Sequence, residues 1–245
     1  RKHEELTTIK SENKLKTKNR NNTLTNNTKQ VSPDIPFSQE LLRKGVHLIS
    51  ISIPIGYYYA TKELAFMILI PVTIFFLIID IFGRKKTIIQ KLLHTYFGKM
   101  LRPHEVEDRL VLNGASWVLL SALLCILIFP KLLVVTGFAV LILSDSSAAI
   151  FGRKFGKHKF YHKSYEGSFA FFVAGLITVF YIAFTNNLPW TFYAFGAVAV
   201  LVGTIVEALS ASVIKIDDNL TIPLSIGIVL WIGNYFAALL NLPYI

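Results

Sequence analysis

Long apolar runs separated by short polar segments make up most of the chain after residue 45. Six of these runs come close to the length of a bilayer-spanning helix, which needs about 20 predominantly apolar residues. A seventh run, Val46–Ala60, is shorter and contains Pro54. The six long runs are Leu64–Ile81, Ala115–Phe129, Leu132–Ile150, Gly167–Phe184, Trp190–Val213 and Leu220–Leu240. The pattern predicts an all-α polytopic integral membrane protein with about seven transmembrane helices.

The composition agrees with this class. Hydrophobic residues make up 53% of the 245 residues and charged residues only 16%, whereas a soluble domain carries about a quarter charged residues. The net charge is +10, but the basic residues flank apolar runs, where they are expected to face the cytoplasm and its anionic lipids. We therefore expect no nucleic-acid partner. The single cysteine, Cys125, excludes a disulfide framework within the chain.

Charge also predicts the domain organisation and the topology. Residues 1–36 are rich in Lys, Asn and Thr and poor in apolar residues, so we expect a disordered basic cytoplasmic tail before a multi-span membrane domain at 37–245. Seven basic residues in 83–114 and five in 151–166 fall on one side of the membrane. The rule that Lys and Arg favour the cytoplasmic side then places the N-terminus inside and the C-terminus outside. The first run is short enough to be re-entrant.

Acidic residues within or beside the spans are the strongest candidates for chemistry. Asp145 lies in the last turns of the fourth predicted span, Leu132–Ile150, and Glu207 lies within the sixth. An ionisable group in a span is costly and by default marks a functional site. Asp217 and Asp218 follow at the cytoplasmic end. Carboxylates opposite Lys and Arg suit Mg²⁺ with a polyphosphate, although such acids can also reach water or pair with a neighbouring cation.

Several catalytic motifs are absent from the sequence. The segment GRKFGK at 152–157 has three residues between its glycines instead of four, and His158 stands where a Walker A loop has Ser or Thr. The histidines show no zinc-type spacing, and no G-x-S-x-G segment occurs. The glycines of this segment could still bring backbone N–H groups close to phosphate, with Lys and Arg adding positive charge.

Five motifs in this order resemble the CTP-dependent lipid-alcohol kinases, a family that includes dolichol kinase, phytol kinase and the CTP-dependent diacylglycerol kinase. It is related to the phosphatidate cytidylyltransferases. The resemblance covers roughly residues 40–240. Its motifs are RKGVH at 43–47, LNGAS at 112–116, DSSAAIFGRKFGK at 145–157, KSYEGS at 163–168 and DDNLTIP at 217–223. The longer S-P-K-K-T-x-E-G loop and the D-R-x-D signature of the cytidylyltransferases are absent, which favours the kinase branch.

The resemblance implies phosphoryl transfer from CTP to the hydroxyl of a membrane lipid alcohol, with Mg²⁺ or another divalent cation such as Ca²⁺. It implies catalytic roles for Asp145, Lys44 and Arg43, and metal binding by Asp145, Asp217 and Asp218. Glu207, the acid within the sixth span, is a further candidate metal ligand. The nucleotide-binding residues that it implies are Asn113, Gly152, Arg153, Lys154, Gly156, Lys157, Lys163, Ser164, Glu166 and Gly167, and Asn219 belongs to its last motif.

Diacylglycerol is the first acceptor to consider, followed by dolichol or another polyprenol and phytol. The alternative enzyme is a phosphatidate cytidylyltransferase that makes CDP-diacylglycerol, and the non-enzymatic alternative is a membrane transporter or lipid-binding protein. The active site would face the cytoplasm from the bacterial inner membrane or the endoplasmic reticulum. The sequence does not determine the host membrane or the oligomeric state.

The topology predicts accessibility from outside. Cysteines introduced at Lys91 and Lys159 should resist an impermeant thiol reagent in intact cells or sealed microsomes, because both loops are expected to be cytoplasmic. A cysteine at Asn187 should react. Labelling at Lys159 from outside would overturn the assigned orientation.

Overall fold

The computed structural model describes residues 37–82, 112–160, 163–210 and 216–245. The predicted tail at 1–36 and most of the basic loop at 83–114 lie outside the described residues. Lys91 lies outside them as well.

The predicted all-α membrane architecture is confirmed. In the described ranges, five helices are long and apolar enough to cross a membrane: α4 (Lys62–Phe82), α8 (Lys131–Phe155), α9 (Tyr165–Thr185), α10 (Trp190–Leu209) and α11 (Asp218–Leu239). A shorter apolar helix, α7 (Gly114–Ile128), precedes α8. The short strands β1 (Lys159–Phe160) and β2 (Lys163–Ser164) pair in antiparallel fashion between α8 and α9.

The run predicted as the first span, Val46–Ala60, is divided between two helices. These are α2 (Phe37–Ile49) and α3 (Ser52–Tyr59). The amide groups of Ser50, Ile51 and Ile53 each donate to the carbonyl three residues earlier, so the chain turns tightly between the helices. Pro54 explains the break, because proline has no amide hydrogen and is best accommodated in the first turn of a new helix.

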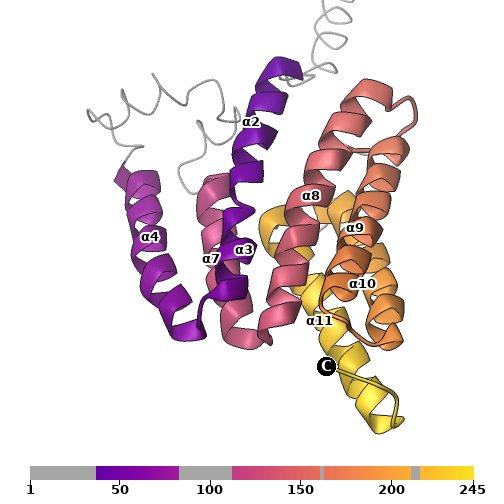
Figure 1. The fold of residues 1–245 in the computed structure, drawn as a ribbon. Helices are drawn as coiled ribbons and strands as arrows, with labels where there is room; N and C mark the ends of the chain where they lie inside the picture. Colours follow the sequence, from indigo (N-terminus) through magenta and orange to yellow (C-terminus); the bar gives the residue numbers. More distant parts are fainter. Residues whose placement is uncertain (1–36, 83–111, 161–162, 211–215) are drawn as a thin grey trace, which may run out of the picture. The chain divides into compact units, whose positions relative to one another are not determined.

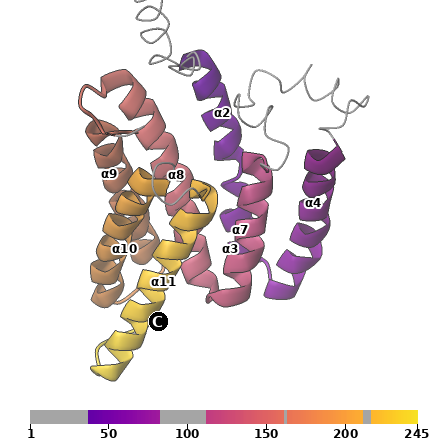
Figure 2. The same ribbon diagram turned by 180° about the vertical axis from the view of Figure 1, so that it is seen from behind.

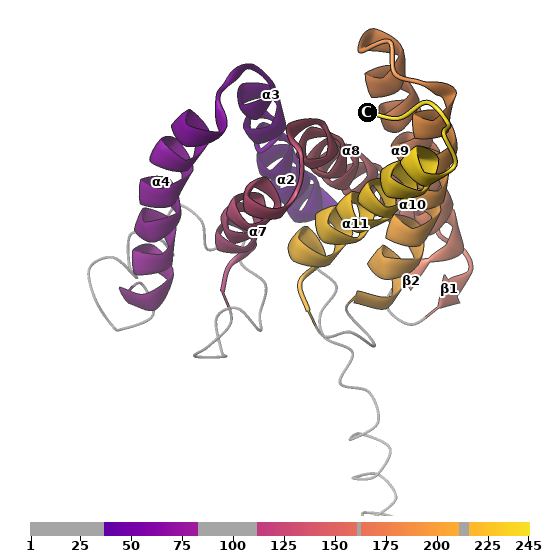
Figure 3. The same ribbon diagram turned by 90° about the horizontal axis from the view of Figure 1, so that it is seen from below.

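Helix α8 is the central element. It contacts α9 and α11 as well as α2, α3 and α7, and Figures 1 and 2 show α9 on one side of α8 and α2, α3 and α7 on the other. Its middle segment is fully buried at Val140, Leu141 and Ile142. Helix α4 instead packs on α7 at the periphery, where Figure 3 shows α7 between α4 and α11.

The alternation of helix directions brings the polar residues to one end. The upper part of Figure 1 contains the C-termini of α4, α8 and α10. It also contains the N-termini of α7, α9 and α11. We call this part the upper end. At the opposite, lower end, Lys62 Nζ donates to Leu127 O at 3.2 Å and Lys131 Nζ donates to Ala60 O. These bonds join the α3–α4 turn to the α7–α8 turn. The two lysines at the lower end therefore have a structural role.

Glycines let α8 and α9 approach closely at the upper end. A Cβ atom added to Gly167 would lie 3.0 Å from Ala148 O and 3.2 Å from Gly152 Cα, both of them backbone atoms. A Cβ atom on Gly152 would in turn lie 3.3 Å from Gly167 Cα. Small residues at such a crossing are typical of helix packing in membranes.

Replacing Gly167 should therefore destabilise the protein. Gly167→Ala places a methyl group against backbone atoms that cannot rotate away, and overpacking of this kind costs about 1–3 kcal/mol. Gly56→Ala in α3 is the matched control, because a Cβ atom there has nothing within 4 Å. The control should keep or raise the Tm in detergent. Equal Tm values for the two variants would contradict the close crossing.

Candidate functional site

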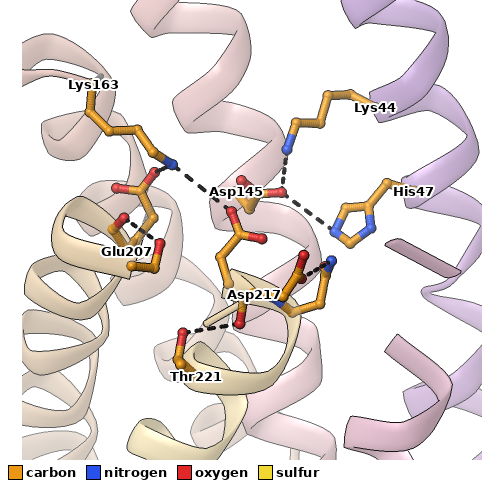
Figure 4. A network of polar contacts seen from close by, with 10 residues as sticks. Lys44, His47, Asp145, Lys163, Glu207, Asp217 and Thr221 are labelled. Carbon is orange, nitrogen blue, oxygen red and sulfur yellow. Dashed lines mark hydrogen bonds and ion pairs between the residues drawn. The ribbon is translucent and has the colours of Figure 1, made fainter. Parts of the chain in front are cut away.

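Charged side chains from five elements meet inside the upper end of the structure. Figure 4 shows them pointing toward one another from α2, α8, β2, α10 and α11. We call this group the charged cluster, and its members are Lys44, His47, Asp145, Lys163, Glu207 and Asp218. Burying charges is unfavourable unless they are paired, and the cluster satisfies this condition with two ion pairs.

The first ion pair joins α2 to α8. Lys44 Nζ donates to Asp145 Oδ2, and the two side chains are only 6% and 7% exposed. His47 Nε2 lies 3.6 Å from the same carboxylate oxygen. Lys44 and His47 are three residues apart and so share one face of α2. The carboxylate of Asp145 therefore faces two basic side chains from a single helix.

The second ion pair joins β2 to α10 and lies close to α11. Lys163 Nζ donates to Glu207 Oε1 and lies 4.0 Å from Asp218 Oδ2. Burial lowers the pKa of Lys163, but the nearby carboxylates of Glu207, Asp218 and Asp145 outweigh this effect, so the pKa is raised above its ordinary value. Lys163 is accordingly charged at neutral pH.

Two polar atoms in the cluster have unused bonding capacity. Glu207 Oε2 and His47 Nε2 are buried, and neither has a hydrogen-bond partner within the described structure. Buried polar atoms are nearly always hydrogen-bonded in native proteins. Such atoms beside two lysines identify a place where a ligand with matching polar groups could bind.

The position of Asp145 in its helix differs from the prediction. The sequence predicted a span ending at Ile150 and placed Asp145 in its last turns, whereas α8 continues to Phe155. At a rise of about 1.5 Å per residue, the end of the helix is roughly 15 Å beyond Asp145. Asp145 is thus an interior helix residue, and the basic residues that follow in sequence are carried away from it.

The basic side chains of the glycine-rich stretch are exposed, in contrast to the buried charged cluster. Arg153, Lys154 and Lys157 are exposed, and Lys154 Nζ lies 5.3 Å from the ring centre of Phe155. Gly152 lies within α8, and a Cβ atom added to Gly156 would lie 2.7 Å from Ser164 Oγ. The structure therefore gives Gly152, Gly156 and Gly167 a packing role around Ser164, and nucleotide binding by this stretch stays a prediction.

Most of the remaining predicted residues lie at helix ends. Ser164 caps α9 by accepting from Gly167 N at 3.1 Å, and Glu166 Oε1 accepts from His158 Nδ1 at 2.9 Å. Asp217 caps α11 by accepting from Asn219 N at 3.0 Å. Arg43 is half-buried and precedes Lys44 in α2.

Asn113 caps α7, and its Oδ1 accepts from Ser116 N at 2.9 Å. These contacts stabilise the helix ends that surround the charged cluster.

The carboxylates suit a hard divalent cation, although the described residues contain no group of three His, Cys, Asp or Glu side chains placed to hold a metal. Mg²⁺ usually binds through one or two carboxylates together with substrate phosphates and water, so it needs no complete protein cage. Asp145, Glu207 and Asp218 supply oxygen atoms of this type within one cluster. Metal binding by these residues and Asp217 stays a prediction.

Two residues were missed by the sequence reasoning. His47 belongs to the RKGVH motif but was given no role, and its spacing from Lys44 indicates a shared helix face. Asp80 interrupts the apolar run of α4 and is buried, with 7% of its surface exposed. The rule that singled out Asp145, an acid inside a span, applies equally to Asp80.

Comparisons with known proteins relate the chain to two bacterial proteins. It is 32% identical over 193 residues to "Uncharacterized protein RP860" of Rickettsia prowazekii (strain Madrid E), which covers 77% of this chain and 92% of that protein. The chain belongs to the same family as this rickettsial protein. It is also 29% identical over 108 residues to "Phytol kinase" of Synechocystis sp., covering 40% of this chain and 43% of the kinase.

The match to phytol kinase indicates a distant relationship to a lipid kinase, in agreement with the coarser part of the resemblance seen in the motifs. No family model and no solved structure matches the chain.

The Lys163–Glu207 pair can be tested by changing each partner. Glu207→Leu leaves Lys163 without its main partner, and Lys163→Met leaves a carboxylate that is 2% exposed without a counter-charge. Each single change should lower stability by about 3–5 kcal/mol, whereas the double variant should recover most of the loss. Melting curves of the four proteins in one detergent provide the measurement, and additive losses would contradict a direct pair.

The pH dependence has a definite sign. Because the pKa of Lys163 is raised in the folded protein, the contribution of its charge to stability is fully present below the ordinary lysine pKa. It is lost only as the pH rises through the raised value. The difference in Tm between the wild type and the Lys163→Met variant should therefore persist from neutral to mildly alkaline pH. A difference that vanishes near neutral pH would contradict a charged Lys163.

Proposed function

We propose that this chain, as a member of the rickettsial protein's family, transfers a phosphoryl group from CTP to the hydroxyl of a membrane lipid alcohol. The observation that carries the proposal is the charged cluster, in which Lys44 and Lys163 meet three carboxylates at one end of a membrane helix bundle. The partial match to phytol kinase supports the same reaction class. The motif order supports CTP as the donor.

The reaction requires little covalent chemistry from the protein. The lipid hydroxyl oxygen bonds to the γ-phosphorus of CTP while the bond from that phosphorus to the bridging oxygen breaks, so CDP leaves with the bond's electron pair. The hydroxyl proton passes to a carboxylate of the charged cluster. Catalysis then depends on positioning and on the neutralisation of phosphate charge. Lys44 and Lys163 provide that positive charge.

A divalent cation would be held by Asp145, with Glu207, Asp217 and Asp218 as further oxygen donors. When bound, it would neutralise phosphate oxygens of the nucleotide. The lysines now paired with Asp145 and Glu207 are long and flexible, so their ammonium groups can turn toward phosphate while the carboxylates keep their positions. The cluster would thus exchange internal ion pairs for contacts with a polyphosphate.

The location of the cluster favours a membrane enzyme over a transporter. Secondary transporters bind their substrates near the bilayer midplane, whereas Glu207 and Asp218 of the cluster lie where α10 ends and α11 begins. A water-soluble nucleotide and a hydroxyl at the lipid headgroup can both reach such a position. Diacylglycerol is the first acceptor to test, and phytol, dolichol and undecaprenol complete the panel.

Purified protein should phosphorylate at least one lipid of this panel, with a higher rate from CTP than from ATP. Thin-layer chromatography of the lipid fraction after incubation with labelled nucleotide measures the product. Equal or faster turnover with ATP would contradict the donor while leaving the reaction class intact. Consumption of no nucleotide with any lipid, together with binding or movement of a solute, would favour a transporter.

Asp145→Asn should lower turnover by roughly a thousandfold, if the carboxylate supplies about 4 kcal/mol to the transition state. The variant keeps the size of the side chain, but it leaves the buried ammonium group of Lys44 without its counter-charge, so the Tm should fall as well. Glu63→Gln, in the first turn of α4 at the lower end, is the control and should keep wild-type turnover. Turnover and Tm are measured on the same preparation. Normal turnover in a protein of lowered Tm would show that Asp145 only joins two helices.

A further inference from the structure

A further buried carboxylate lies at the upper end, on a helix outside the charged cluster. Asp80 is in the last turn of α4 and is 7% exposed. It lies on the face of α4 that also contains the buried residues Thr73 and Ala65, and α4 packs against α7. The five motifs of the sequence do not include it. Its role is therefore open to inference from its contacts.

Both oxygens of Asp80 are used by one residue. Asn113 N donates to Asp80 Oδ2 at 3.0 Å, and Asn113 Nδ2 donates to Asp80 Oδ1. The amide oxygen of Asn113 is bonded as well, since Oδ1 accepts from Ser116 N at 2.9 Å and caps α7. An amide whose oxygen and nitrogen are both engaged has one orientation only. Asp80 thereby prevents the side chain of Asn113 from flipping.

The fixed end of α7 lies beside the beginning of α11. A Cβ atom added to Gly114 would lie 3.7 Å from Asn219 Nδ2. Asn219 Nδ2 also donates to Asp217 Oδ1 at 2.7 Å. Asp218, which lies between these two residues in the chain, has its Oδ2 atom 4.0 Å from Nζ of Lys163 in the charged cluster. A continuous series of contacts therefore leads from α4 through α7 to α11 and the charged cluster.

We propose that Asp80 is a positioning residue for nucleotide binding: it fixes the amide of Asn113 and the first turn of α7 against the first turn of α11. The inference rests on the proposed function, because it takes Asn113, Asp217 and Asp218 as parts of the nucleotide and metal site. Asp80 touches neither nucleotide nor lipid. It acts through Asn113, so its loss should affect the nucleotide more than the lipid acceptor.

The kinetic test compares Asp80→Ala, Asp80→Asn and Thr73→Val. Thr73 is the matched control, since it is buried on the same face of α4 and donates only within that helix, to Leu69 O. Asp80→Ala should lower kcat/KM for CTP by roughly a hundredfold, because a displacement of about 1 Å in a positioning residue can have this effect. Asp80→Asn retains one acceptor oxygen and should be intermediate. Thr73→Val should stay within about twofold of the wild type.

A second readout does not depend on turnover. The chain contains three tryptophans, and replacing Trp190 and Trp231 with Phe leaves Trp117 in the first helical turns of α7. In this protein with Asp80 unchanged, CTP added without a lipid acceptor should shift the fluorescence emission of Trp117. With Asp80→Ala added, the CTP concentration that produces the same shift should rise at least about tenfold. Asn113→Ala should behave likewise, and the double variant should be no worse than the more affected single variant.

The outcomes separate this inference from the proposed function. A protein that binds CTP but phosphorylates no lipid would overturn the proposed function, while weaker CTP binding in both Asp80 variants would still support the positioning role. Additive effects of Asp80→Ala and Asn113→Ala would overturn the positioning role, even in an active kinase. The positioning role would also be overturned if Asp80→Ala lowered the Tm but left kcat/KM for CTP and the Trp117 response unchanged. If Asp80→Ala does not fold, Asp80→Asn decides the matter by the same readouts.

Discussion

The buried ion pair between Lys44 and Asp145 is the contact on which the upper end of the structure depends. It joins α2, the first described helix, to α8, the central one, and both side chains are almost removed from solvent. A charge of this kind is costly in a membrane span unless it is paired. A lone Asp145 or a lone Lys44 would be unfavourable, so the pair requires the two helices to meet where they do.

The second pair extends the same principle to the other half of the bundle. Lys163 holds Glu207 of α10 and approaches Asp218 of α11, so five elements converge on one group of charges. The elements are brought there by close helix packing, with glycines at the α8–α9 crossing. A cluster made of long lysines and short carboxylates is stable without ligand and can exchange partners when a phosphate or a cation enters. That property suits phosphoryl transfer at a membrane surface.

Much of the fold follows from the sequence, because apolar length alone predicts helices such as α4 and α11. The acids Asp145 and Glu207 are recognisable in the same way. The pairing of charges is not, since Lys44 and Asp145 are 101 residues apart and Lys163 and Glu207 are 44 apart. No local pattern indicates which lysine meets which acid.

The basic stretch shows a further limit of sequence reasoning. Lys154 and Lys157 follow Asp145 closely in sequence, which suggested one shared site. Because α8 continues to Phe155, Lys154 lies roughly 14 Å from Asp145 along the helix axis, and a site shared by both stays a prediction. The break between α2 and α3 had a visible signal in Pro54, but proline alone does not distinguish a kinked span from two helices.

In the proposed reaction, the γ-phosphoryl group of CTP ends on a membrane lipid at the charged cluster. The most direct test supplies the detergent-purified protein and its lipid acceptor with CTP labelled either at the α-phosphate or at the γ-phosphate. Label should enter the lipid from γ-labelled CTP only, with CDP as the released nucleotide. Label entering from α-labelled CTP, with release of pyrophosphate, would instead establish cytidylyl transfer and contradict phosphoryl transfer.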